Sequence, residues 1–496
     1  MNYSWLDTHR IFYLARLFFY LMIAFAAVYG LAEVIFYLWV DYPFNKYEPE
    51  VALEAWRISQ GEPIYTPLDT GPYAGLYAPL FQLTGAFLYL IFGESITILR
   101  LISIASLAGI VYFGWKLAPR QTWWQLLFAA VLVIIWHSRV VQFDMHAKPD
   151  SYAIMLGIAA IMPFFAGGTL RRYAWLISGL LAALAFAAKQ PMLLFTAGIG
   201  VALLLHGRWK EGFSFGFSFL GVSIVLWWLL SLLTGDEILF YTLIQPGAFD
   251  IPAARLAGSA ISIINNWWFP IVLILMLRRW LNQNWQLIDT LLLSCLVFAY
   301  PASILTAAKG GGLSNGYMPF YYLMSVIIIR NFQVESLFRP LSFTRLPVVF
   351  THGWRSAFAL YLGLAIFFTI GLNPASYITS WQHRANAHQN YERLASWLKD
   401  TEGDVYAPMD NYLSLKIDRP WYWSAKSELD LSAVKPDIQR KYRSKALEAD
   451  ITVAVDWADW YQADSMEQQL QEAGYSMVKE LSMEQGTTYR IWKQNE

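Results

Sequence analysis

The chain has few cysteines and few charged residues. A single cysteine, Cys295, occurs in 496 residues, which excludes a disulfide framework and a cysteine zinc site. Lys, Arg, Asp and Glu make up 15% of the chain, whereas ordinary soluble domains carry about 25%. The 36 basic and 36 acidic residues balance, so nothing in the net charge favours a nucleic-acid partner. His137 and His146 are separated too widely for metal-ligand spacing, so the scattered histidines predict no metal site.

What the chain does contain is apolar sequence. Hydrophobic residues make up 57% of it and aromatic residues 17%, and windows of 17 to 23 apolar residues recur. Each window could cross about 30 Å of hydrocarbon as a helix. The runs are uniformly apolar rather than alternating, which indicates helices and not barrel strands. We therefore predict an all-α polytopic protein, integral to a bacterial inner or plasma membrane.

Hydropathy and basic flanks together predict about eleven spans. These apolar runs lie at 14–40, 96–116, 122–137, 151–168, 173–188, 190–207, 213–234, 259–277, 286–307, 317–330 and 356–374. The apolar segment 78–93 is assigned to the membrane interface, because the basic flanks then fall on one side. These flanks contain Arg10, Arg16, Lys116, Arg120, Arg171, Arg172, Arg208, Lys210, Arg278, Arg279, Arg330, Arg339, Arg345 and Arg355. The positive-inside rule then places the N-terminus in the cytoplasm and the C-terminus outside.

The chain divides into two predicted domains. Residues 1–374 form a transmembrane domain whose outer loop, 41–95, carries interfacial helices, and residues 375–496 form a charged and polar tail. Helical and strand-like segments alternate in the tail, at 390–400, 404–408, 451–456 and 465–475, followed by SMVKEL and TTYRIWK. This alternation predicts a small soluble α/β domain outside the membrane.

Two carboxylates, Glu48 and Glu50, follow the first span within a few residues. Ionisable groups beside a spanning helix are costly and are therefore functional candidates. One of the two is expected to act as a general base on a hydroxyl at the membrane surface. The alternative is an acidic helix N-terminus that favours the helix dipole, with Pro49 between the two carboxylates. Glu54 is expected on a solvated face.

A second polar cluster follows the third span. Asp144, His146, Lys148 and Asp150 alternate there, which predicts an acidic and basic patch facing the first. Lys148 or His146 would then lie near a phosphate. Asp150 followed by Ser151 is equally typical of a helix N-cap.

Three basic residues and one loop complete the set of candidates. Lys189 lies between two apolar runs, where it either snorkels to the headgroups or binds an anion near the helix that Pro191 begins. Lys309 precedes three glycines. The lysine would supply positive charge and the glycines would let the backbone approach a ligand closely. The alternative is that the segment is only a flexible turn. Arg100 lies near the outer end of a span and therefore needs an anionic partner. If that partner is a carboxylate of the first outer loop, Arg100 organises the structure and is not a catalyst. Segment 235–257 either covers the site or is a plain connector.

Together these features resemble the membrane-bound glycosyltransferases of the C-type fold. That family uses polyprenyl-phosphate-linked sugars and includes the protein mannosyltransferases and the lipid A aminoarabinose transferase. The resemblance rests on the acidic first loop, a Tyr-x-Pro-Leu start at Tyr77, Phe92-Gly93, Arg100-Leu101, the second acidic loop, the turn at Lys189 and the Lys-Gly…Asn-Gly-Tyr segment. By this likeness Glu48 stands where the family has the second residue of an Asp-Glu pair. Tyr47 stands in place of the family's aspartate.

The resemblance implies an inverting transfer from a polyprenyl-phosphate sugar to a hydroxyl or amine of a lipid, glycan or protein on the outer face. Glu48 would be the base, with Glu50 in reserve and Asp144 and Asp150 assisting. The residues implied in substrate binding are Lys148, His146, Lys189, Lys309, Asn315, Tyr65 and Arg100. No nucleotide cofactor is implied. A divalent metal, which some relatives use and others do not, stays open as an alternative, but the ligand spacing does not support one.

Two other functions stay open. A transporter of lipid-linked glycans would need polar residues along the middle of several spans, whereas the charges here cluster at the outer ends. A membrane scaffold that presents the outer domain would not need paired acidic loops.

Overall fold

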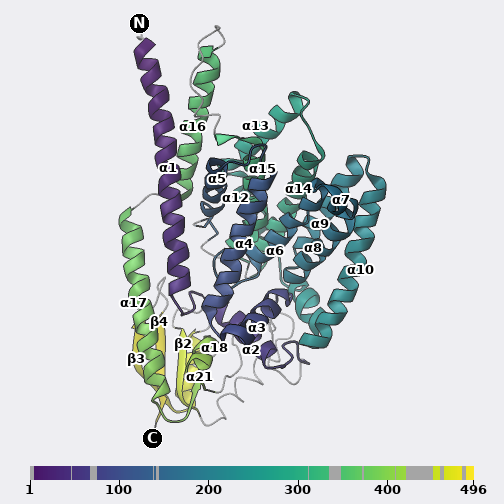
Figure 1. Ribbon diagram of the computed structural model, residues 1–496. Helices are drawn as coiled ribbons and strands as arrows, with labels where there is room; N and C mark the ends of the chain where they lie inside the picture. Colours follow the sequence, from purple (N-terminus) through teal and green to yellow (C-terminus); the bar gives the residue numbers. More distant parts are fainter. Residues whose placement is uncertain are drawn as a thin grey trace.

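The computed structural model describes residues 5–45, 47–67, 75–137, 139–140, 144–310, 312–334, 348–370, 374–407, 409–419, 451–457, 463–482 and 488–495. Figure 1 shows a long helical bundle with a small sheet packed at one end. Two of the basic flanks predicted from the sequence, Arg339 and Arg345, lie outside the described residues.

Every predicted span corresponds to a helix or to a pair of consecutive helices. They are α1 (Trp5–Trp39), α4 (Ile96–Leu117), α5 (Trp123–Ile134), α6 (Asp150–Ala159) with η1 (Met162–Phe165), α8 (Ala174–Ala188), α9 (Met192–Leu205), α10 (Trp209–Thr234), α12 (Ala253–Ile264) with α13 (Trp268–Leu281), α14 (Leu287–Ala308), α15 (Met318–Asn331) and α16 (Val348–Ile370). Short elements connect them: α7 (Gly168–Arg172), the π-helical η2 (Phe240–Ile244), α11 (Gln245–Gly247) and η3 (Ser314–Tyr317).

Length and hydropathy single out fewer unbroken spans than the sequence analysis predicted. Among the described residues, four helices are long and apolar enough to cross a membrane: α1, α4, α10 and α14. The pair α12 and α13, bent by 60°, makes a fifth if it is counted as one span. The polytopic helical architecture is thus confirmed, and the count of eleven stays a prediction.

Small residues set how closely the helices of the bundle approach. Gly198 of α9 faces the backbone of α14, where an added Cβ would lie 2.7 Å from the Cα of Cys295. A side chain at Gly198 would therefore force the two helices apart, as is typical of close helix packing in membranes.

Two helices of the predicted outer loop, α2 (Glu48–Ser59) and α3 (Leu80–Phe92), pack together at the sheet end of the bundle (Figure 1). Helix α3 is the segment predicted to lie in the interface. The chain between them is anchored to the end of α10, because the amides of Ile64 and Tyr65 donate to the Thr234 carbonyl at 2.9 and 2.8 Å. Gly235 has a φ of +115°, and its Cβ would lie 2.3 Å from the Tyr65 carbonyl oxygen, so only glycine fits.

The tail contains the predicted alternation of helices and strands. Its elements are α17 (Pro374–Lys399), β1 (Asp404–Tyr406), α18 (Asn411–Lys416), β2 (Ile451–Trp457), α21 (Ala463–Glu472), β3 (Tyr475–Ser482) and β4 (Thr488–Gln494). The sheet order is β1-β2-β4-β3. Strand β2 pairs parallel with β1 and antiparallel with β4, and β3 pairs antiparallel with β4. The predicted Pro408 at the end of β1 lies outside the described residues.

The tail is fastened to the first outer loop. The hydroxyl of Tyr412 donates to Asp41 Oδ1 at 2.8 Å and accepts from the Ile96 amide, the first of α4, at 3.3 Å. Lys416 adds an ion pair to Asp41 at 3.1 Å. Tail and first loop therefore lie together at one end of the bundle.

Candidate functional site

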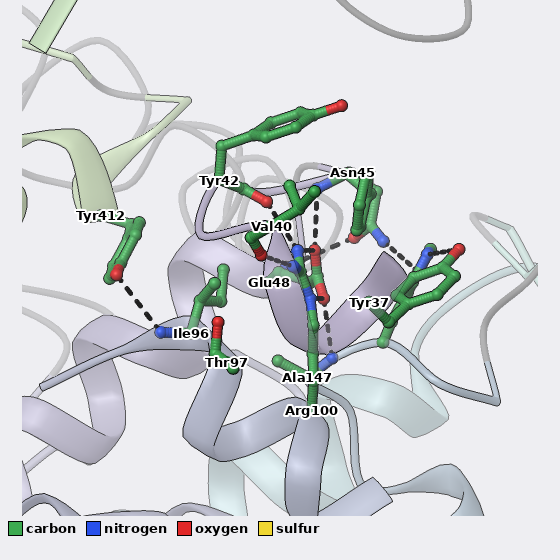
Figure 2. Close-up of polar contacts among 12 residues, drawn as sticks. Tyr37, Val40, Tyr42, Asn45, Glu48, Ile96, Thr97, Arg100, Ala147 and Tyr412 are labelled. Carbon is green, nitrogen blue, oxygen red and sulfur yellow. Dashed lines mark hydrogen bonds and ion pairs between the residues drawn. The ribbon is translucent and has the colours of Figure 1, made fainter. Parts of the chain in front are cut away.

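Glu48 begins α2 and forms a buried ion pair with Arg100 of α4. Arg100 Nε donates to Oε1 at 2.9 Å and Nη2 donates to Oε2 at 2.7 Å, and neither side chain is exposed to solvent. Figure 2 shows the Arg100 side chain reaching the Glu48 carboxylate from α4. The carboxylate partner expected for Arg100 is thus present, and it is Glu48.

Backbone groups complete this pair, which we call the Glu48 clamp. The amides of Phe44 and Ala147 each donate to the Glu48 carboxylate at 2.8 Å. Arg100 in turn donates to the carbonyls of Val40 at 2.5 Å and Tyr42 at 2.6 Å (Figure 2). The clamp therefore joins the end of α1, the first outer loop, α4 and the second polar cluster.

The electrostatics of the clamp do not favour the predicted role of Glu48 as a base. Burial raises the pKa of its carboxyl, but the Arg100 guanidinium and the donated hydrogen bonds outweigh burial and lower the pKa to about 2. A carboxylate with four donors and a depressed pKa is a poor proton acceptor at neutral pH. Glu48 instead positions the first turn of α2, which carries Glu50.

Glu50 and Glu54 are both buried, at 3% and 4% exposure. Glu54 accepts from the Gly75 amide at 2.6 Å and from Gln82 Nε2 at 3.0 Å. The expectation of a solvated Glu54 was wrong, because the chain returning at Gly75 covers that face of α2. An added Cβ at Gly75 would lie 3.1 Å from Glu50 Oε2, so Glu50 lies under the same segment.

His146 is buried among aromatic and polar groups. Asn45 Nδ2 donates to Nδ1 at 2.5 Å, so in the neutral ring Nε2 carries the proton and faces the Tyr37 hydroxyl at 3.2 Å. Burial, together with the charges of Arg100 and Lys148, lowers the pKa of His146 to about 3 despite the attraction of Glu48. A neutral His146 has no charge to offer a phosphate, which argues against its predicted binding role.

The Lys148 ammonium group packs against aromatic rings and does not face an open anion site. Its Nζ lies 4.2 Å from the centroid of the Tyr47 ring and 5.8 Å from that of Tyr77. Tyr65 also has a structural role: its hydroxyl donates to the Tyr77 carbonyl at 2.5 Å. These contacts fix the segment that covers α2.

Asp144 belongs to a buried chain of polar side chains. His137 Nδ1 donates to Asp144 Oδ1 at 2.6 Å, and the Tyr322 hydroxyl donates to Oδ2 at 2.9 Å. On its other side, His137 Nε2 lies 3.4 Å from Glu33 Oε2, and that oxygen accepts from Arg384 Nη1 of α17 at 2.8 Å. Both Asp144 oxygens are thus engaged, and the chain links α15 to the tail. Sequence reasoning missed Glu33, a lone carboxylate within the first apolar run.

Asp150 differs from the other buried carboxylates of this end. Its Oδ1 accepts from Lys189 Nζ and, at 3.0 Å, from Asn315 Nδ2. Its Oδ2 is buried and has no hydrogen-bond partner among the described residues. Asp150 is the first residue of α6 and Pro149 is the N-cap without a side-chain bond, so the capping interpretation was wrong. The predicted candidates Asp150, Lys189 and Asn315 therefore come together.

Lys309 follows α14 and is half-buried. Burial lowers its pKa, and among the described residues no carboxylate pairs with it. Gly312 packs closely against the end of α14, since an added Cβ there would lie 2.4 Å from the Thr306 carbonyl oxygen. Lys309 and Asn315 lie on either side of this glycine in the sequence.

The loop after α10 reaches across this end of the bundle. The Gly310 amide donates to the Asp250 carbonyl at 2.9 Å, and Gln190 Nε2, which sequence reasoning missed, donates to the carbonyls of Leu76 and Thr242 at 2.7 and 2.8 Å. Part of the predicted covering segment 235–257 thus touches both the glycine turn and the Lys189–Pro191 turn.

No metal centre is evident in the described part of the chain. No group of three or more His, Cys, Asp or Glu side chains there could hold a metal ion. The buried carboxylates described above each have a protein cation or neutral donors beside them, which does not fit a divalent ion.

Comparisons with known proteins bear on the fold. No family model and no curated sequence matches the chain. Its structure is similar to ArnT from Cupriavidus metallidurans bound to undecaprenyl phosphate, with a TM-score of 0.57 and 11% identity over 95% of this chain and 97% of ArnT. The apo ArnT structure gives a TM-score of 0.56 and 12% identity over 94% and 97%.

An archaeal oligosaccharyltransferase, AglB from Archaeoglobus fulgidus, matches 98% of this chain and 74% of its own at 11% identity. The TM-score of this match is 0.43. At such identities the likeness to ArnT shows the fold alone. The chain therefore shares the fold of ArnT, in agreement with the fold that the sequence resemblance predicted.

Proposed function

We propose that this protein is a membrane glycosyltransferase that moves a sugar from a polyprenyl-phosphate-linked donor to an acceptor hydroxyl or amine. The fold shared with ArnT, whose structure holds undecaprenyl phosphate, supports this proposal. Asp150 carries it, because a buried carboxylate oxygen without a partner, beside a lysine, is typical of a catalytic site.

The proposed reaction is an inverting displacement at the anomeric carbon. The acceptor oxygen or nitrogen bonds to that carbon while the bond from the carbon to the phosphate oxygen breaks. The lipid phosphate leaves with the electron pair, and the acceptor's proton passes to a carboxylate. Positive charge develops on the sugar and negative charge on the phosphate, so a carboxylate and a lysine each stabilise one of them. No nucleotide is needed, because the lipid phosphate is already the leaving group.

The contacts suggest a role for each candidate. Asp150 accepts the proton through Oδ2, while Lys189 and Asn315 hold Oδ1 in place. Lys309, which has no carboxylate partner in the described part of the chain, neutralises the phosphate. Glu50, buried at the start of α2, is the alternative base.

We further propose that residues 1–374 are the transmembrane catalytic domain and that residues 375–496 lie on the outer face, with the N-terminus in the cytoplasm of a bacterium. The contacts of the tail with Asp41, and of the second polar cluster with Glu48, support a common side for these segments. The acceptor would be a lipid, a glycan or a protein that reaches this side.

Substitution of Asp150 by Asn tests the proposal. Full-length protein in membranes of the producing cells would be given undecaprenyl phosphate carrying a radiolabelled hexose or pentose, and release of free undecaprenyl phosphate measured. Loss of a positioned base lowers such rates by about 10²–10⁴-fold, so Asp150→Asn should reduce release by that factor at unchanged protein level. Asp236→Asn, an exposed carboxylate after α10, is the matched control and should keep the wild-type rate.

Undiminished release by Asp150→Asn would remove Asp150 from proton transfer and leave Glu50→Gln as the variant to test. If the wild type released no lipid phosphate but moved the labelled lipid across proteoliposomes, the transporter alternative would replace the enzyme. If it did neither, the scaffold alternative would stand.

A further inference from the structure

A cavity of about 590 Å³ opens at the end of the bundle away from the Glu48 clamp. It lies between α7 and the first turns of α8 and α10, and its lining includes Arg171, Arg172, Trp175, Lys210, Glu211 and Ser214. In Figure 1, α7 lies toward the end of the bundle opposite α2 and α3. The function proposed above makes no use of this cavity.

The lining carries an excess of positive charge. Glu211 is the one carboxylate among the lining residues, and it is already shared: Arg171 donates to it at 3.2 and 3.4 Å, and Arg208 also pairs with it. Arg172 contacts the ring of Tyr173 at 5.7 Å, and neither it nor Lys210 has a carboxylate partner among the described residues. Two cations are therefore available to an anion in the cavity.

The surfaces next to the cavity are those of a helix in lipid. Leu176 and Leu180 of α8, and Phe213 and Phe217 of α10, are exposed apolar side chains that continue from the cavity along the bundle. Trp209 is exposed beside it, at the start of α10. Tryptophan at the end of an apolar helix is typical of the headgroup layer of a membrane.

The length of α10 indicates at which level of the bilayer the cavity lies. Its 26 residues span about 39 Å at 1.5 Å per residue, enough to cross the hydrocarbon core. The last residue of α10, Thr234, is bonded to the first outer loop. The first turn of α10, which lines the cavity, therefore lies at the headgroups of the other leaflet.

We propose that this cavity binds the phosphate of an anionic phospholipid. Arg172 and Lys210 contact the phosphate, Arg171 borders it, and the acyl chains follow the exposed apolar faces of α8 and α10. A free phosphate ion shares the headgroup's chemistry but gains nothing from those faces, and only a lipid accounts for both features. This site is separate from the one proposed for the sugar donor, which lies at the other end of the bundle.

Native mass spectrometry of the purified full-length protein tests the proposal. The protein would be exposed to phosphatidylglycerol and, separately, to phosphatidylcholine, and the lipid retained per molecule counted. Each basic side chain near an anionic headgroup contributes about fivefold to binding. The double variant Arg172→Ala with Lys210→Ala should therefore retain phosphatidylglycerol about 25-fold less tightly than the wild type, with phosphatidylcholine unaffected.

The matched control removes the same charge elsewhere. Arg120→Ala with Arg278→Ala replaces two exposed arginines of the predicted basic flanks outside the cavity and should retain phosphatidylglycerol as the wild type does. Equal losses in both double variants, or equal retention of the two lipids by the wild type, would overturn the proposal. Displacement of phosphatidylglycerol by millimolar inorganic phosphate would assign the cavity to the soluble ion instead. Thermal midpoints of both variants would confirm that each is folded.

Discussion

Glu48 and Asp150 are both buried beside a cation at the same end of the bundle, yet their oxygens are used differently. Both oxygens of Glu48 accept, from Arg100 and from the amides of Phe44 and Ala147. Asp150 uses only Oδ1, and its Oδ2 has no partner in the described part of the chain. Two buried carboxylates of one protein thus differ in whether an oxygen is left without a donor.

We interpret this difference as that between a structural carboxylate and the base proposed above. A carboxylate whose two oxygens are filled by charged and backbone donors stays ionised and holds segments together. A buried oxygen without a donor costs about 1–3 kcal/mol, and native proteins keep few such atoms without a functional reason. Burial and an ion pair alone therefore do not identify a base, and the open oxygen is the feature on which the proposal for Asp150 rests.

Removal of Arg100 should have the largest effect on stability. Arg100→Ala leaves Glu48 charged and buried without its cation, which typically costs about 3–5 kcal/mol. The midpoint of heat unfolding of the purified protein should fall accordingly. The exposed Arg278 provides the control, because Arg278→Ala should change stability by no more than about 0.5 kcal/mol. Similar small shifts in both variants would mean that the clamp contributes little.

Glu48→Gln sharpens the comparison with Asp150→Asn. The glutamine variant should lose stability, while the rate per folded molecule falls much less than in Asp150→Asn, because the proposal gives proton transfer to Asp150. The asparagine variant should instead lose about 10²–10⁴-fold in kcat and less stability than the glutamine variant, because Lys189 is 12% exposed whereas Arg100 is fully buried. Rates normalised to folded protein, with midpoints measured alongside, separate the two. A larger rate loss for Glu48→Gln than for Asp150→Asn would reverse the assignment.

Asp410 of the tail extends the comparison to a carboxylate with neutral donors. The Tyr489 hydroxyl and the Leu413 amide donate to it, at 2.6 and 3.2 Å, and burial raises its pKa to about 6. Because the pKa of Asp410 is higher in the folded state, its protonation stabilises the folded protein. This contribution to stability is full below the unfolded-state pKa of about 3.9 and is lost as the pH rises through about 6.

The resulting loss in wild type should approach about 3 kcal/mol between pH 4 and 7. Unfolding midpoints of the wild type and of Asp410→Asn across this range measure it. The asparagine variant should show a flatter profile, since it cannot ionise. Parallel profiles would show that Asp410 does not titrate in this range.

Lys416 should have the smallest effect. Its ion pairs with Asp41 at 3.1 Å and Glu392 at 2.8 Å are partly exposed, and such pairs contribute about 0.2–1 kcal/mol. Lys416→Ala should lower the unfolding midpoint slightly at 50 mM salt and by less at 1 M salt. A shift as large as that of Arg100→Ala would mean that exposure does not separate these pairs.

Local sequence signals predicted the elements well. Long apolar runs became helices, and the alternation in the tail gave the strands near 404–406, 451–457 and 475–482. The lengths of the spans were predicted less well. Helices such as α6 and α8 are too short to cross a membrane on their own. Hydropathy averages over a window and does not detect where a helix ends inside it.

The site was predicted only in part, because most of its contacts are between distant segments and backbone groups. Arg100 at the end of a span signals that a carboxylate is near, but not that the amide of Ala147 completes the pair. Glu54 lies on a face that only the return of the chain at Gly75 covers. Asp150 could not be told from an N-cap without its neighbours Lys189 and Asn315.

The pairing of Glu33 with Arg384 has a consequence for biosynthesis. The two residues are 351 positions apart, so at about 5–20 residues per second the arginine is made roughly 20–70 s after the glutamate. During that interval the first membrane helix carries the Glu33 carboxylate, while its partner Arg384 has not yet been synthesised. The ion pair of the first helix can therefore form only after about three quarters of the chain has been translated.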